Sequence, residues 1–131
     1  MNIAFFLLPK KEVICLHAES TIRQAMEKME YHRYTAVPVI DEKGHYIKTI
    51  TEGDLLWKIK NTKGLSFQNS EHHYIKDIMV NRDYRPVHID AEMEDLMSLV
   101  AVQNFVPVVD DNEVFIGIIR RMDIIHYLSK V

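Results

Sequence analysis

The residues with the clearest chemical potential are a hydroxyl and a carboxylate three positions apart, Thr51 and Asp54. They follow an apolar run and precede leucines, so the spacing predicts the first turn of a helix. One interpretation is a structural capping box, worth about 1 kcal/mol. The other is a ligand site, because a helix start offers N–H groups and a positive dipole end to a phosphate, while the aspartate can accept hydrogen bonds from ribose hydroxyls.

A related pair, Arg120 and Asp123, stands at the same spacing near the end of the chain. An arginine cannot cap a helix, but its guanidinium can pair bidentately with a phosphate. Arg121 follows directly and is a further candidate for a phosphate contact. The alternative is that Arg120 is a surface arginine and the site is empty.

Other reactive side chains indicate no catalytic or metal site. His72 and His73 form an adjacent pair with no third ligand at metal spacing, so we expect a surface pair. Cys15 is the only cysteine and lies in an apolar run, which predicts a buried, inert thiol. The sequence contains no nucleophile elbow and no glycine-rich phosphate loop, so we predict that the protein is not an enzyme.

The two candidate sites belong to an internal repeat. Val37–Asp41 (VPVID) recurs as Val106–Asp110 (VPVVD), and Asp54 recurs as Asp123 at the same offset of 69 residues. A twofold repeat predicts two half-domains with a cleft along their axis, where ligands bind.

Each half is predicted to have the order β-α-β-β-α. The first half begins with a strand over Val13–Leu16, followed by a helix that starts at a Thr-x-x-Gln capping box at Thr21. Two strands follow, over Ala36–Ile40 and Tyr46–Ile50, and a second helix starts at Thr51. The second half repeats this order: Pro86–Ile89, Asp90–Val102, Phe105–Val109, Val114–Ile119 and Met122–Leu128. The predicted domains are residues 1–60 and 74–131, with residues 61–73 as a linker.

Composition limits the class of protein. The chain has 131 residues, a net charge of −3 and a pI near 6.1, which gives no electrostatic footprint for a nucleic acid. The apolar opening Ile3–Leu8 is too short for a secretory signal or a membrane span and is predicted to be a buried element. We therefore expect a soluble, cytoplasmic protein that does not associate with membranes.

The repeated h-x-h-Pro-h-h-Asp element, followed by a strand that ends in Thr/Ser-x-x-Asp, resembles the CBS domain, named after cystathionine β-synthase. Thr35–Asp41 with Ile50–Leu55 carry the resemblance in the first copy, and Asn104–Asp110 with Gly117–Ile124 carry it in the second. The resemblance implies an α+β fold in which a tandem pair forms one pseudo-twofold Bateman-type module. It also implies a regulatory homodimer that binds adenine nucleotides such as AMP, ADP or ATP and signals to an effector protein.

Further site residues follow from the resemblance alone. The site at Arg120 and Asp123 would use Ile14, Tyr34 and Thr35 around the base. The site at Thr51 and Asp54 would use Gln103 and Asn104, with the strand near Pro86 and Val87.

Lys48 departs from the family pattern, which has a glycine at this position, as Gly117 does in the second copy. A lysine here can obstruct the first site or contact a phosphate.

Two alternatives to an adenine mononucleotide sensor stay open. Val114, Phe115, Gly117, Arg120 and Arg121 resemble the small cyclic-di-AMP-binding CBS proteins. The other alternative is a structural dimer with degenerate, empty sites. In either case a dimer is predicted from apolar side chains on the last helix of each copy: Leu55, Leu56, Ile59, Ile124, Ile125 and Leu128.

Overall fold

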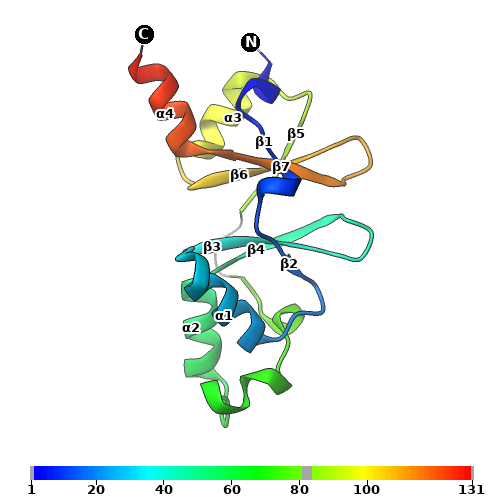
Figure 1. The fold of residues 1–131 in the computed structure, drawn as a ribbon, viewed down its shortest axis with the longest axis vertical. Helices are drawn as coiled ribbons and strands as arrows, with labels where there is room; N and C mark the ends of the chain where they lie inside the picture. The colour runs from blue at the N-terminus through cyan, green and yellow to red at the C-terminus, as the bar shows by residue number, and fades with distance from the viewer. Residues whose placement is uncertain (1, 81–83, 131) are drawn as a thin grey trace. The chain divides into compact units, whose positions relative to one another are not determined.

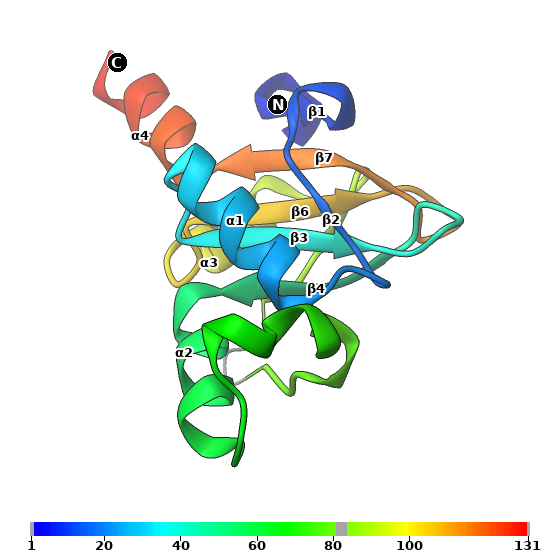
Figure 2. The ribbon, with the colours of Figure 1, turned by 60° about the horizontal axis from the view of Figure 1, so that its bottom comes forward.

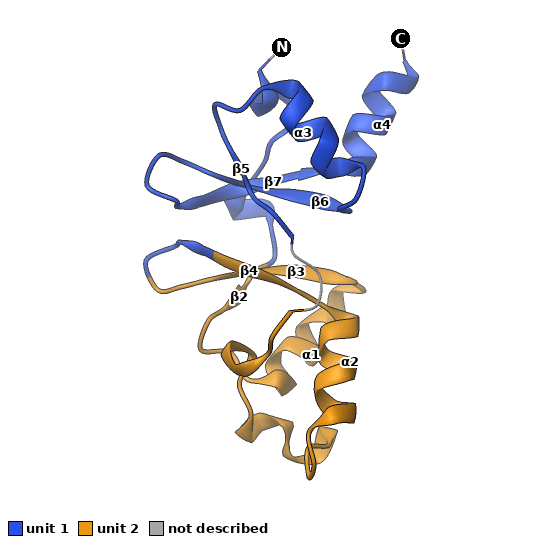
Figure 3. Cartoon of the chain, turned by 180° about the vertical axis from the view of Figure 1, so that it is seen from behind, with its two compact units in different colours: residues 1–14, 43–46, 84–131 blue, residues 15–42, 47–83 orange. Residues whose placement is uncertain are grey.

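The computed structural model of the chain describes residues 2–80 and 84–130. The chain divides into two compact units, coloured separately in Figure 3. Unit 1 comprises residues 1–14, 43–46 and 84–131, and unit 2 comprises residues 15–42 and 47–83. Each unit contains a small sheet and two helices, which confirms the predicted α+β class.

Unit 2 contains the first copy of the repeat. Its three-stranded sheet has the order β2 (Leu16–His17), β3 (Ala36–Ile40) and β4 (Tyr46–Thr51), and β2 pairs parallel with β3. The helices α1 (Ile22–His32) and α2 (Glu52–Asn61) both lie on one face of this sheet (Figure 1). Aliphatic side chains from the sheet, both helices and a following 3₁₀ turn form the core: Leu16, Ile22, Ala25, Met29, Val37, Val39, Ile50, Leu55, Leu65, Ile75 and Ile78.

Unit 1 contains the second copy together with the start of the chain. Its sheet has the order β1 (Leu8–Pro9), β7 (Phe115–Arg120), β6 (Phe105–Val109) and β5 (Val87–His88). The helices α3 (Met93–Val100) and α4 (Arg121–Ser129) cover one face of it. Its core is a second aliphatic cluster: Ile3, Phe6, Val87, Leu96, Val100, Val106, Val108, Ile119 and Ile124.

The N-terminal segment is an integral part of unit 1. Strand β1 lies beside β7 (Figure 2), and the two pair antiparallel with Leu8 opposite Ile118. A 3₁₀ turn over Ile3–Phe6 precedes β1 and buries Ile3 and Phe6. The prediction of a buried element is only partly right, because Phe5 faces outward from this turn and is 66% exposed. The boundaries predicted at residues 60 and 74 stay a prediction.

Local sequence signals placed α1 well, but they misplaced the start of one strand and of one helix. The predicted capping box at Thr21 is formed, and α1 begins at the next residue. The first strand is short and begins at Leu16 rather than Val13, because a 3₁₀ turn over Lys10–Glu12 leads directly into Val13. Helix α3 begins at Met93 rather than Asp90, because the N–H of Ala91 bonds back to the carbonyl of His88 in a turn.

The segment predicted as a linker is attached to α1. A 3₁₀ turn covers Phe67–His72, and the Arg23 guanidinium donates hydrogen bonds to the carbonyls of Phe67 (2.6 Å) and Gln68 (2.8 Å). The same guanidinium pairs with the Glu71 carboxylate. Within residues 2–80 and 84–130, no helix is both long enough and apolar enough to cross a lipid bilayer.

Candidate functional site

The start of α2 is a complete capping box. The Asp54 carboxylate accepts a hydrogen bond from the Thr51 N–H at 2.9 Å, and the Thr51 hydroxyl accepts one from the Asp54 N–H at 3.1 Å. Thr51 and Asp54 therefore form the structural capping box that was one of the two interpretations of their spacing. Asp54 is only 4% exposed, so its carboxylate is nearly inaccessible to solvent.

The residues before β3 lie next to this helix start. The N–H of Glu52, the first residue of α2, donates to the carbonyl of Thr35 at 3.0 Å. Thr35 and Tyr34 are exposed, and the Tyr34 ring stacks on the His32 ring. The backbone of Thr35 thus belongs to the surroundings of the first helix start, within unit 2.

The Lys48 side chain on β4 bonds to the backbone of another segment of unit 2. Its ammonium donates to the carbonyls of Ile75 (2.8 Å) and Ile78 (2.7 Å). Burial lowers the pKa of the Lys48 ammonium below its usual range, and the nearby carboxylates of Asp54 and Asp77 oppose that shift. Lys48 therefore bonds to two carbonyls of unit 2 while its charge lies near that of Asp54.

The start of α4 differs from that of α2. The Arg120 guanidinium pairs bidentately with the Asp123 carboxylate, with Nε–Oδ2 at 2.8 Å and Nη2–Oδ1 at 3.2 Å. Arg120 is the N-cap residue, and its side chain makes no capping bond to the helix backbone. The two side chains are 43% and 31% exposed, so this charged pair is open to solvent.

Arg121 and Asn104 surround the same helix start. The N–H of Arg121 donates to the carbonyl of Asn104 at 3.0 Å, which matches the contact of Glu52 with Thr35 in the first copy. The Arg121 Nε donates to the carbonyl of Val100 at 2.7 Å. Val100 is the last residue of α3, so Arg121 supplies a positive charge at a helix C-terminus, where it is favourable.

Gln103 is buried and fully engaged with the backbone. Its Oε1 accepts from the Arg85 N–H at 2.9 Å, and its Nε2 donates to the carbonyls of Arg85 and Phe105, both at 3.1 Å. The amide thereby ties residue 85 to the start of β6. A ligand role for Gln103, and for half-buried Ile14, stays a prediction, as does the assignment of base-contacting residues to the opposite half.

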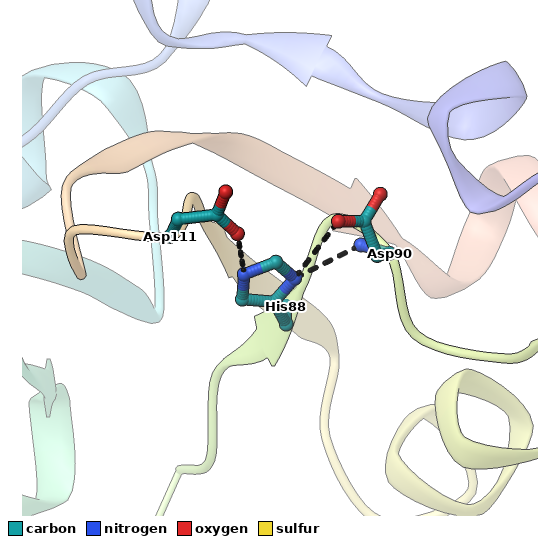
Figure 4. Close-up of side chains that lie close together, drawn as sticks. All are labelled: His88, Asp90 and Asp111. Carbon is teal, nitrogen blue, oxygen red and sulfur yellow. Dashed lines mark hydrogen bonds and ion pairs between the residues drawn. The ribbon is translucent and has the colours of Figure 1, made fainter.

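A third cluster was not anticipated from the sequence. His88, Asp90 and Asp111 come together in unit 1 (Figure 4). The His88 Nδ1 accepts a hydrogen bond from the Asp90 N–H at 3.1 Å, and Nε2 lies 2.7 Å from the Asp111 carboxylate. Each aspartate thus meets a different ring nitrogen of His88. One ligand atom from each of the three residues also lies within 4.8 Å of the others. The expectation that the protein binds no metal stays a prediction.

The apolar residues predicted to form a dimer surface differ in their exposure, and one of them, Ile59, is half-buried. Leu55 and Ile124 are buried in the cores of their own units, so they were wrongly assigned to the surface. Leu56, Ile125 and Leu128 are more than half exposed. A hollow of about 420 Å³ lies between α1 and α2, lined mainly by Met26, Met29, Leu55, Leu56 and Ile59.

Comparison with known proteins identifies the repeat. The family model described as "CBS domain" matches residues 7–61 and 75–130. The chain is also 28% identical over 117 residues to an inosine-5′-monophosphate dehydrogenase of Methanocaldococcus jannaschii, covering 88% of this chain but 21% of that protein. It spans only that small part of the enzyme.

Solved structures with the same fold cover almost the whole chain. The CbpB protein of Listeria monocytogenes, in complex with c-di-AMP, has a TM-score of 0.85 at 20% identity, over 98% of this chain and 95% of that one. CBSX2, in complex with AMP, has a TM-score of 0.76 at 21% identity, over 98% and 96% of the two chains.

Proposed function

The chain belongs to the CBS domain family, and from this premise we propose that it is a regulatory module that binds an adenine nucleotide and signals to a partner protein. The observation that carries the proposal is the start of α4. There an arginine and an aspartate are paired at the partly exposed N-terminus of a nine-residue helix.

Each group at this helix start has a counterpart on a nucleotide. The Arg120 guanidinium can exchange the Asp123 carboxylate for a phosphate, because two oxygens of a phosphate can accept the same pair of parallel N–H bonds. The Arg121 N–H is bonded to the carbonyl of Asn104, but the other N–H groups in the first turn of α4 are not capped by the Arg120 side chain and offer further donors to the same anion. Asp123, once released, can accept hydrogen bonds from the ribose hydroxyls. Solvent reaches this partly exposed pair and weakens it, so the exchange costs less than it would in a buried pair.

Relatives support an adenine base. CbpB was solved with c-di-AMP and CBSX2 with AMP, and both share the fold of this chain. A cyclic dinucleotide receptor is therefore the second candidate. The position of Arg121 favours the mononucleotide, because its Nε is bonded to the end of α3. That leaves Arg120 as the principal guanidinium for phosphate at this site.

A thermal-shift titration tests the proposal. AMP, ADP, ATP and c-di-AMP are added to the protein, with GMP as a control for the base. A ligand that binds only the folded state adds about 2.7 kcal/mol at 100 times its Kd, which raises the Tm by several degrees. We expect at least one adenine ligand to do so and GMP to have a smaller effect.

Matched variants locate the site. Asp123→Asn keeps the shape of the side chain and removes its charge, and it should abolish the shift. Asp95→Asn is the control, because Asp95 occupies the same third helical position on α3, where it is exposed. If no adenine ligand moves the Tm of the unmodified protein, the proposal is wrong.

Regulation rather than catalysis is part of the proposal. We expect no ATP hydrolysis above the buffer control in the same samples. Binding would instead fix Arg120 and the first turn of α4, and a partner protein would respond to that change. Dimerisation through the exposed Leu56, Ile125 and Leu128 is proposed as well, and sedimentation at micromolar concentration tests it.

A further inference from the structure

We propose that Lys48 closes the first helix start to nucleotides, so that each chain holds one ligand, at α4, rather than two. This inference rests on the proposed function. It concerns which of the two repeated sites is competent, and it comes from a difference between equivalent positions of the two copies.

The glycine in the second copy allows one backbone to pack directly on another. Gly117 lies on β7 opposite Pro9 of β1. A Cβ atom added to Gly117 would lie 2.2 Å from the carbonyl oxygen of Leu8. The incoming N-terminal segment thus takes up the space that a side chain would need.

In the first copy, a side chain replaces that backbone contact. Lys48 stands at the position equivalent to Gly117, and a 3₁₀ turn over Ile75–Asp77 packs into unit 2 much as the turn over Ile3–Phe6 packs into unit 1. The Lys48 ammonium holds the turn by donating to the carbonyls of Ile75 and Ile78. A neighbouring segment is therefore held against the sheet by side-chain hydrogen bonds in the first copy and by strand pairing in the second.

A positive charge also lies near the carboxylate that a ribose would need. The charge of Asp54 lies close enough to Lys48 to oppose the loss of its proton. Asp54 is buried and already accepts the Thr51 N–H, whereas Asp123 is partly exposed and pairs with a partly exposed arginine. The equivalent aspartates of the two copies thus differ: Asp54 is buried, whereas Asp123 is partly accessible to solvent.

A ligand at the first helix start would have to undo this arrangement. Ribose hydroxyls could reach Asp54 only if the capping box opened and the charge of Lys48 lost a nearby counterion. Groups buried without partners are unfavourable, which lowers affinity at this start far below that at α4. At the start of α4, a ligand needs only to replace Asp123 as the partner of the Arg120 guanidinium, in a pair that solvent already reaches.

Isothermal titration calorimetry with AMP, and separately with c-di-AMP, tests the inference through stoichiometry. If AMP binds, one competent helix start predicts one AMP per chain, and two competent helix starts predict two. We expect one AMP per chain in the unmodified protein, no binding in Asp123→Asn, and unchanged binding in Asp54→Asn. Lys48→Gly should bind two AMP per chain, and Asp54→Asn in that background should return the value to one.

Controls separate the lysine from general effects. Lys48→Met keeps the aliphatic stem, removes the charge and serves if Lys48→Gly does not fold; it should also expose a second, weaker site. Lys60→Met changes an exposed lysine at the end of α2 and should leave one site. Two AMP per chain in the unmodified protein, one of them lost in Asp54→Asn, would overturn the inference, as would one AMP per chain in both Lys48 variants. Failure of any adenine ligand to bind the unmodified protein would instead refute the proposed function.

Discussion

Replacing Gly117 by alanine should destabilise the protein strongly. Gly117 has φ +156°, a conformation that side-chain-bearing residues rarely adopt. The added Cβ would meet the Leu8 carbonyl oxygen at 2.2 Å and the Leu7 Cδ1 at 2.8 Å. The first neighbour is backbone, so relief requires β1 to move away from β7.

The expected magnitude has two parts. An unfavourable φ costs about 1–3 kcal/mol, and forcing extra volume into a packed site costs a similar amount. We expect a loss of about 3–4 kcal/mol in the free energy of unfolding. For a chain of this length that lowers the Tm by roughly 10 °C.

Urea unfolding of three glycine variants isolates the effect of the strand contact. Gly64→Ala is the control for conformation alone, because Gly64 has φ +83° and no atom within 4 Å of the added Cβ, so the expected loss is only about 1 kcal/mol. Gly53→Ala is the control for substitution in ordinary helix, where the contacts begin at 3.7 Å and alanine gains up to about 1 kcal/mol. If Gly117→Ala unfolds no more easily than Gly64→Ala, the packing of β1 on β7 described above is wrong.

Two other substitutions test buried polar groups. Gln103→Leu leaves the backbone partners at Arg85 and Phe105 without the amide, so we expect a loss of about 2–3 kcal/mol in urea unfolding, against almost none for Gln68→Leu at an exposed position. An unchanged midpoint for Gln103→Leu would contradict the assigned bonds. Burial lowers the pKa of the Lys48 ammonium below 10.5, so between the lowered pKa and 10.5 the unfolded chain binds more protons than the folded one. The stability of the protein relative to Lys48→Met should therefore rise with pH across that window and fall as the pH decreases through it. Thermal melts of both proteins from pH 7 to pH 10.5 measure this relative stability. If the stability of the unmodified protein relative to Lys48→Met falls as the pH rises, the burial of the ammonium is contradicted.

Local patterns made much of the fold predictable. The Val-Pro-Val runs became β3 and β6 over the expected residues, because β-branched residues followed by a turn have few alternatives. The capping boxes at Thr21 and Thr51 were equally clear, because the two partners of each box are three residues apart.

Features that depend on distant segments were not predictable. Strand β1 is two residues long and carries no alternation, so only its partner β7 defines it. The hydrogen bonds of Lys48 go to a turn about 30 residues later, and no local signal connects them. The spacing correctly predicted that Asp123 lies in the first turn of a helix, but it could not show that Arg120 folds back onto that carboxylate.

The pairing of Leu8 with Ile118 also constrains the order of assembly during synthesis. Every strand and helix of unit 2 has left the ribosome before β7 has been made, so that unit can close early on contacts of its own. Residues 3–14 must wait, with Ile3 and Phe6 uncovered, until the last quarter of the polypeptide emerges. Contacts between such distant segments form slowly, and exposed apolar segments invite aggregation in the meantime. A bulky fusion at the N-terminus should therefore disturb maturation of the second repeat, although it is attached ahead of the first.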